Sequence, residues 1–99
     1  MRILDHLTHL DLSQNPLGDQ AVSSLASNIL KKTKALTVLN LASTQITYKG
    51  VTYICKALKD NISVIALYLQ TIPGKIRNII GSKGALEIGK FLNNSSNVL

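Results

Sequence analysis

The sequence repeats one pattern of apolar residues at a fixed distance. Six apolar positions of the first third recur in the second third, all at the same offset. They are Leu7, Leu10, Leu12, Leu17, Leu25 and Ile29, which return as Leu36, Leu39, Leu41, Ile46, Ile54 and Leu58. A period of about 20–50 residues is typical of proteins built as a stack of like units. The repeat therefore predicts a stack with an extended surface, in place of one enclosed active site.

Each unit joins a strand pattern to a helix pattern. The segments Leu7–Ser13 and Leu36–Ala42 contain L-x-x-L-x-L, which places leucines two residues apart on one side of an extended strand. A polar turn follows each strand, and apolar residues then recur at helical spacing. We expect helices near 19–31, 48–59 and 83–92.

A third unit is interrupted by an insertion. Its strand pattern, Val64–Gln70, aligns Val64 with Leu7, whereas its helix pattern aligns Gly84 with Ala21 and so comes six residues late. This difference indicates an insertion at 72–77, where Pro73-Gly74 is a typical turn pair. We expect a single domain over residues 1–99, with a first unit at about 7–35, a second at about 36–63 and a third at about 64–99.

The string LTHLDLSQNPLGDQAVSSLASNIL, residues 7–30, resembles a leucine-rich repeat of the ribonuclease-inhibitor-like class. The second unit has Thr44 where that class usually has Asn, and the third unit matches once the insertion is removed. The resemblance implies an α/β fold, a right-handed αβ solenoid with three parallel strands inside an arc and three helices outside. Repeats of this class generally serve as recognition scaffolds in immune receptors, GTPase regulators and secreted bacterial effectors.

Two columns of matched positions bear on the structure of the stack. Asn15, Thr44 and Asn78 follow the strands at corresponding places, and we expect them to form a ladder that satisfies backbone groups of the turns. Thr44 has only one hydroxyl, so the ladder is predicted to be weaker there. Ala26, Cys55 and Gly89 form a column of small residues, which predicts close helix–sheet packing and a buried Cys55.

The outward-facing strand residues are the expected binding surface. The residues predicted to point away from the helices are His9, Asp11, Ser13, Val38, Asn40, Ala42, Ala66, Tyr68 and Gln70. From these we expect partner contacts at His9, Asp11, Asn40, Ala66, Tyr68 and Gln70, joined by Lys75 and Arg77 of the inserted loop. Tyr68 is the one large anchor in the set, and a tyrosine buried at an interface is a frequent binding hot spot.

The same residues argue against catalysis. His6, His9 and Asp11 lack a third metal ligand in their unit, and no nucleophile stands in a defined motif. We therefore expect no catalytic, metal or cofactor site. Lysines at matched helix positions, Lys49 with Lys83 and Lys56 with Lys90, are expected on the convex side as a solvated face, or alternatively as a docking stripe for an acidic partner.

One segment favours an alternative function. Ile79-Ile80-Gly81-Ser82-Lys83-Gly84 resembles the loop with which KH domains clamp nucleic acid, and the net charge of +6 permits such a ligand. The repeat already accounts for these residues, however, and only seven residues follow Leu92, where a KH fold needs further strands. Nucleic-acid binding through this basic Gly-Ser-Lys-Gly loop is therefore the alternative hypothesis.

The preferred function is that of a non-catalytic protein–protein recognition scaffold. Neither end carries a polar capping unit, so we expect a fragment of a longer repeat array or self-association through the uncapped ends. One cysteine favours a reducing compartment, and neither a signal peptide nor a membrane span is apparent. The expected location is the cytoplasm, or a host cytoplasm if the protein is a delivered effector.

Overall fold

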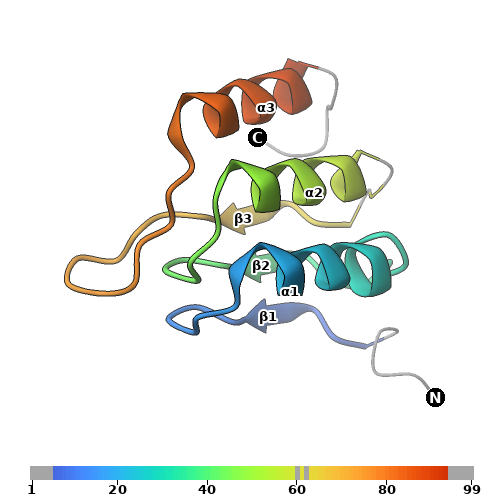
Figure 1. Ribbon diagram of the computed structural model, residues 1–99. Helices are drawn as coiled ribbons and strands as arrows, with labels where there is room; N and C mark the ends of the chain where they lie inside the picture. The colour runs from blue at the N-terminus through green and yellow to red at the C-terminus, as the bar shows by residue number, and fades with distance from the viewer. Residues whose placement is uncertain (1–5, 60, 62, 94–99) are drawn as a thin grey trace.

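The computed structural model describes residues 6–59, 61 and 63–93. Strands and helices alternate along the chain, and the strands form a layer behind the helices (Figure 1). The elements are β1 (His9–Asp11), α1 (Gly18–Leu25), the π-helix η2 (Ala26–Leu30), β2 (Val38–Asn40), α2 (Tyr48–Leu58), β3 (Ala66–Tyr68) and α3 (Gly81–Asn93).

The three strands form one parallel sheet in the order β1–β2–β3. Leu10 pairs with Leu39 and Leu39 with Leu67, so corresponding leucines of successive units lie side by side, as the repeat predicts. Pairing continues past the short strands, because the N–H of Leu41 donates to the carbonyl of Tyr68 at 2.8 Å. The predicted αβ repeat arc with parallel strands is confirmed.

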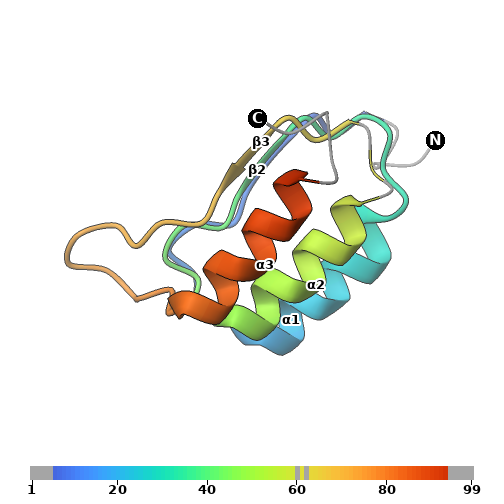
Figure 2. The same ribbon diagram turned by 90° about the horizontal axis from the view of Figure 1, so that it is seen from above.

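The helices lie side by side along one face of the sheet (Figure 2). α2 is the central helix and packs against both α1 and α3. The apolar side of each helix turns toward the leucines of the strands, which is the amphipathic pattern read from the sequence. Among the described residues, the opposite face of the sheet carries no helix.

Among the described residues, the core is fully buried in the middle of the stack and only partly buried at its two ends. In the second unit all six repeat positions are at most 1% exposed: Leu36, Leu39, Leu41, Ile46, Ile54 and Leu58. In the outer units most repeat positions are only partly buried: Leu7, Leu10, Leu12, Leu17 and Ile29 in the first unit, and Leu67, Leu69, Ile80 and Ile88 in the third, where Phe91 is partly buried as well. A repeat buries both of its sides only where it has a neighbour on each.

The first helix departs from the predicted single helix over 19–31. It begins at Gly18 and widens into the π-helix after Leu25, where the N–H of Lys31 donates to the carbonyl of Ala26 at 3.1 Å. The carbonyl of Leu30 accepts a hydrogen bond from Asn61 Nδ2 at 2.8 Å instead of one within the helix. The last carbonyl of the π-helix is therefore bound by a side chain of the second unit.

The column of small residues is tightly packed at only two of its three positions. Ala26 is 3% exposed and Cys55 is 8% exposed, and both belong to the core. A Cβ added to Gly89 would meet no atom within 4 Å. The expectation that Gly89 allows close packing is therefore wrong, since among the described residues no unit lies beyond α3 to press against it.

Candidate functional site

The outward-facing strand residues form two rows across the sheet, which we call the strand face. Asp11, Asn40 and Tyr68 are paired in register and make one row. His9, Val38 and Ala66 make the other. The repeat alone thus brings together residues from three separate parts of the sequence. Gln70 follows two residues after β3 and is exposed.

Two polar residues of the strand face are held by their own turns. Asp11 Oδ1 accepts a hydrogen bond from the N–H of Ser13 at 2.9 Å, and Asn40 Oδ1 accepts one from the N–H of Ala42 at 3.0 Å. Hydrogen bonds from the side chain and backbone of Ser13 lower the pKa of Asp11, so its carboxylate is charged at neutral pH. These bonds present both side chains in fixed orientations.

Tyr68 is the one large aromatic side chain of the strand face. It is 46% exposed at the end of β3, whereas Ala66 in the same strand is half-buried. One residue of the set predicted to face outward is not exposed: Ala42 is fully buried. The chain after β3 passes beside it, because the N–H of Ser43 donates to the carbonyl of Gln70 at 2.9 Å.

The inserted residues 72–77 form a loop that projects from the edge where the strands end (Figures 1 and 2). At its tip the N–H of Lys75 donates to the carbonyl of Ile72 at 3.0 Å, and Gly74 has a φ of +78°. Pro73 followed by a glycine at positive φ is the arrangement of a type II turn. The predicted turn at Pro73-Gly74 is therefore present.

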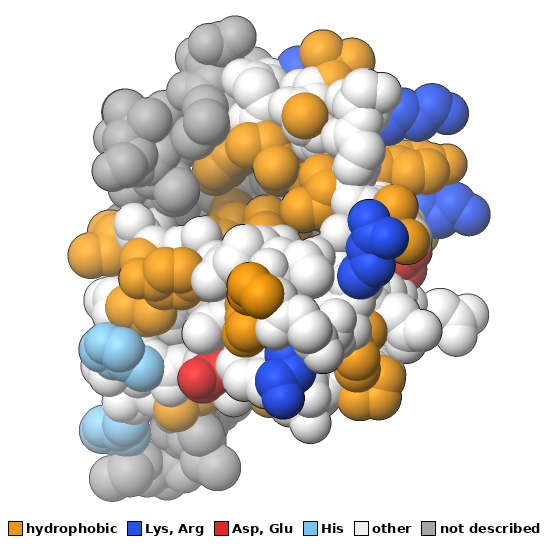
Figure 3. Space-filling view, turned by 90° about the vertical axis from the view of Figure 1, so that its left-hand side faces the viewer, with side chains coloured by type: hydrophobic (Ala, Val, Ile, Leu, Met, Phe, Trp, Pro, Cys, Tyr) orange, Lys and Arg blue, Asp and Glu red, His pale blue; other side chains and the backbone are white. Residues whose placement is uncertain are grey.

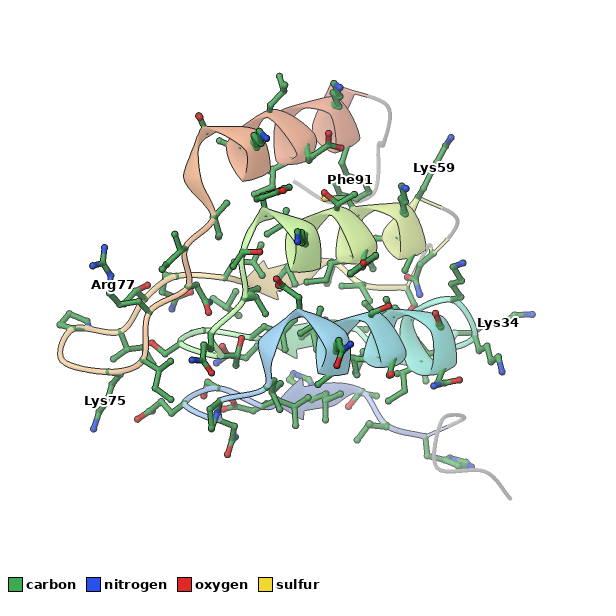
Figure 4. All side chains as sticks on the ribbon, in the orientation of Figure 1. Lys34, Lys59, Lys75, Arg77 and Phe91 are labelled. Carbon is green, nitrogen blue, oxygen red and sulfur yellow. The ribbon has the colours of Figure 1, made fainter. Side chains whose placement is uncertain are left out.

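The base of the loop is fixed to the stack. The N–H of Asn78 donates to Thr71 Oγ1 at 3.0 Å, and the N–H of Ile72 donates to Ser43 Oγ at 2.7 Å. Lys75 and Arg77 are exposed and extend to opposite sides of the loop (Figure 4). Among the described residues, the salt bridges include neither of these two cations. Their charge is available to a partner.

The KH-like segment is not a free loop. Gly81, Ser82, Lys83 and Gly84 form the first turn of α3, where the N–H of Gly84 donates to the carbonyl of Ile80 at 3.1 Å. Gly84 is buried, and a Cβ there would lie 3.5 Å from the backbone of Tyr48. A loop that clamps a nucleic-acid backbone needs exposed glycines. The repeat accounts for this segment and the KH resemblance does not.

The turn ladder joins the units through Asn78. Its Oδ1 accepts the N–H groups of Thr44 at 2.8 Å and Ile46 at 3.1 Å, and its Nδ2 donates to the carbonyls of Leu41 and Leu69, each at 2.9 Å. Thr44 Oγ1 donates to Leu41 within its own turn. Asn78 thus forms hydrogen bonds with backbone groups of the unit before it.

Asn15 occupies the corresponding position in the first unit. Its Nδ2 donates to the carbonyls of Leu12 at 3.0 Å and Ser13 at 3.1 Å, both in its own turn. Among the described residues no unit precedes the first one, so none supplies N–H groups to Asn15 Oδ1. The same column therefore makes bonds within a unit at Asn15 and between units at Asn78.

Two further polar contacts between units were missed in the sequence. Asp19 Oδ1 accepts the N–H groups of Thr47 at 2.8 Å and Gly50 at 3.0 Å, at the start of α2. At the other end of the helices, Asn61 Nδ2 donates to the carbonyls of Leu30 and Thr33. Neither contact follows the repeat: the residues one period after Asp19 and one period before Asn61 are Tyr48 and Lys32.

The convex side carries the lysine columns. Lys83 Nζ lies 5.1 Å from the ring centroid of Tyr48, a cation–π contact that joins the starts of α2 and α3. A depression of about 210 Å³ lies between the ends of these helices, lined by Cys55, Lys56, Lys59, Glu87, Lys90 and Phe91. Burial, followed by the nearby Glu87 carboxylate, raises the pKa of the Cys55 thiol to about 11. Cys55 is therefore a neutral core residue, as predicted.

In the part of the chain that the structure describes, no three His, Cys, Asp or Glu residues gather in a group that would hold a metal ion. No helix there has the length and apolar character needed to cross a bilayer.

The parallel strands, the helices on one face and the apolar repeat positions define a class of protein. The chain belongs to the leucine-rich repeat family. A family model described as "Leucine Rich repeat" matches residues 5–26 and 35–55, which lie in the first and second units.

Two curated proteins and a solved structure are similar to this chain. The chain is 34% identical over 85 residues to leiomodin-1 of Rattus norvegicus and of Homo sapiens, which is 86% of this chain and 14% of each relative. A solved structure described as "Leiomodin-1 Actin-Binding Site 2 (ABS2)" matches with a TM-score of 0.82 and 32% identity, over 93% of this chain and 50% of that one. The chain thus spans about one seventh of the curated relatives and half of the solved domain.

Proposed function

We propose that this chain is a non-catalytic scaffold that binds actin. The observation that supports this proposal is the similarity to the leiomodin-1 actin-binding site, which extends over 93% of the chain. The spacing of 29 residues from Leu7 to Leu36 further favours the ribonuclease-inhibitor-like class of repeats. The leiomodin-1 relatives do not support the nucleic-acid alternative or delivery into a host cell.

The surface proposed to bind the partner is the strand face together with the inserted loop. Tyr68 offers a large, half-exposed ring beside the fixed amide of Asn40. Such a ring covers much apolar area at a low cost in side-chain entropy, and its hydroxyl remains able to form a hydrogen bond. Lys75 and Arg77 add positive charge on a loop with an anchored base, which suits an acidic patch on the partner.

Replacing Tyr68 with alanine is expected to weaken binding to actin by about 2 kcal/mol, or roughly 30-fold in Kd. The matched control is Tyr53→Ala, because Tyr53 is a similarly exposed tyrosine at 40%, on α2 and away from the strand face. Binding is measured by co-sedimentation with actin filaments and by fluorescence titration of monomeric actin. Circular dichroism of both variants should match the parent chain.

The outcomes test the proposed partner and the proposed contact surface separately. If the parent chain binds neither form of actin, the proposed function is wrong. If it binds and Tyr68→Ala binds equally well, actin remains the partner but the strand face is not the contact surface.

Removing both loop cations, in Lys75→Ala/Arg77→Ala, is expected to slow association about tenfold at low salt and to flatten the salt dependence of binding. The control removes the same number of charges at the opposite edge of the stack, in Lys34→Ala/Lys59→Ala (Figure 4). Association rates are measured by stopped-flow fluorescence over a salt series. Equal effects of the two pairs would show that net charge matters and the loop does not.

A further inference from the structure

The outer side of α2 and α3 carries lysines in a regular arrangement. Lys49 and Lys56 lie seven residues apart on α2, and Lys83 and Lys90 lie seven residues apart on α3. Seven residues make two helical turns, so the two lysines of each helix project from the same side about 10 Å apart. All four are exposed. Figure 3 shows Lys or Arg side chains that project from the helix side of the molecule, at the right-hand edge of the view, next to hydrophobic ones.

Few carboxylates of the described residues lie near these lysines. Glu87 Oε1 lies 3.8 Å from Lys90 Nζ, within α3. Asp19 borders Lys49 in a groove over α1 and α2, but both of its oxygens accept hydrogen bonds at the start of α2. The remaining described carboxylate, Asp11, belongs to the strand face. The outer side of these two helices is therefore a net positive surface, which attracts acidic partners.

A mainly apolar depression lies among these charges. It measures about 210 Å³ and lies between α2 and α3, so both of its walls belong to the described residues. Its most buried lining residues are Cys55, whose thiol is neutral, and Phe91. Three lysines and one carboxylate complete the lining: Lys56, Lys59, Lys90 and Glu87. Small-molecule sites typically measure about 300–1,000 Å³, so this depression suits a single apolar side chain better than a cofactor.

A depression bordered by lysines favours an acidic segment of a protein as the ligand. Such a segment can place one apolar side chain in the depression while its carboxylates reach the lysines. Single-stranded nucleic acid instead stacks its bases on open aromatic rings, whereas Lys83 Nζ lies 5.1 Å from the centroid of the Tyr48 ring. At the α3 position that matches Tyr53 stands Glu87, which repels phosphates. An anionic bilayer contacts side chains that project, and not those at the bottom of a depression.

We propose that the outer side of α2 and α3 binds an acidic peptide segment, which seats one apolar side chain against Cys55 and Phe91 and brings carboxylates to Lys56 and Lys90. The helices cover the side of the sheet opposite the strand face (Figure 2), so this surface does not overlap the one proposed for actin. The inference is independent of the proposed binding to actin, and its tests contain no actin.

The first test uses a short fluorescein-labelled peptide of alternating Glu and Asp with one phenylalanine at its centre. Fluorescence anisotropy in about 100 mM salt, where the Debye length is about 10 Å, should show saturable binding to the parent chain. Lys56→Glu/Lys90→Glu should weaken binding at least about tenfold, because both reversed charges would border the depression. No binding by the parent chain, or equal binding by this variant, would overturn the proposal.

The matched control is Lys31→Glu/Lys34→Glu. It reverses the same number of charges, at exposed positions beyond η2 that do not line the depression. It should weaken binding less than about threefold, because salt screens distant charges. Equal losses in the two double variants would show that net charge alone attracts the peptide, which would overturn the assigned site. Circular dichroism establishes that each variant is folded.

Glu87→Gln gives a test that loss of folding cannot imitate, because the expected result is a gain. The change removes the one carboxylate that lines the depression, so the peptide should bind about threefold more tightly. Unchanged or weaker binding would overturn the assigned site. A second peptide, with serine in place of phenylalanine, should bind the parent chain at least about fivefold more weakly, since it lacks the apolar contact. Equal affinities of the two peptides would overturn the role of the depression.

Two further probes test the other kinds of ligand. An oligothymidylate and vesicles that contain phosphatidylserine are titrated with the chain under the same conditions. Weaker binding of both probes than of the phenylalanine peptide would support the proposed partner. Tighter binding of either probe, lost in Lys56→Glu/Lys90→Glu, would assign this surface to nucleic acid or to a membrane and would overturn the proposal.

Discussion

Replacing Asn78 with alanine is expected to lower the free energy of unfolding by about 3 kcal/mol, since each buried polar group left without a partner costs about 1–3 kcal/mol. The change removes the acceptor for the N–H groups of Thr44 and Ile46, both of which belong to residues with no exposed surface. It also removes the donor to the carbonyls of Leu41 and Leu69. These groups lie in two different units, so the loss affects the contact between units.

Urea unfolding followed by circular dichroism measures this effect, and the melting temperature should fall by roughly 10 °C or more. Asn15→Ala is the matched control, because Asn15 holds the same place in the repeat and donates only to its own turn. It should cost about 1 kcal/mol, the typical contribution of exposed or single hydrogen bonds. Equal losses for the two variants would contradict the special role of Asn78.

Replacing Asp19 with alanine is expected to cost about 2 kcal/mol of stability, because hydrogen bonds to a charged group contribute about 1.5–3 kcal/mol. Its carboxylate accepts the N–H groups of Thr47 and Gly50 at the start of α2, and Oδ2 accepts the hydroxyl of Thr47 at 2.6 Å. A negative charge at the N-terminus of a helix is also stabilised by the helix dipole. The measurement is again urea unfolding.

Asp11→Ala is the control for Asp19, since Asp11 is exposed and caps only its own turn. It should change stability by about 0.5 kcal/mol. A double-mutant cycle with Gly50→Ala adds a sharper test, because a Cβ on Gly50 would lie 2.6 Å from Asp19 Oδ1. Gly50→Ala should be less destabilising when Asp19 is already alanine. Additive losses would show that the carboxylate is not pressed against Gly50.

The positions of the strand-face residues could be predicted from the repeat only in part. The alternation of side chains in a strand predicted that Tyr68 and Asn40 lie on one face, and the register places them directly beside each other. The same alternation predicted an exposed Ala42, which is buried because the chain beyond β3 runs alongside it. The repeat predicts the structure of positions that recur in each unit. The inserted residues 72–77 have no counterpart in the other units, so only the folded structure shows where they lie.

The stack itself follows from the sequence alone. The period of 29 and then 28 residues places Leu10, Leu39 and Leu67 in adjacent strands, and an apolar face at helical spacing sets each helix against them. Burial depends on the pattern of apolar residues, and the sequence displays that pattern directly.

The polar contacts between units are only partly visible in the sequence. The repeat predicted the ladder position of Asn78, but only the folded chain shows that Asn78 bonds the unit before it and that Asp19 and Asn61 bond neighbouring turns. A hydrogen bond between two units depends on the meeting of one particular donor with one particular acceptor. The repeat does not predict that meeting at Asp19 and Asn61, because the residues at the equivalent positions, Tyr48 and Lys32, are different. Folding alone brings the two groups within reach of each other.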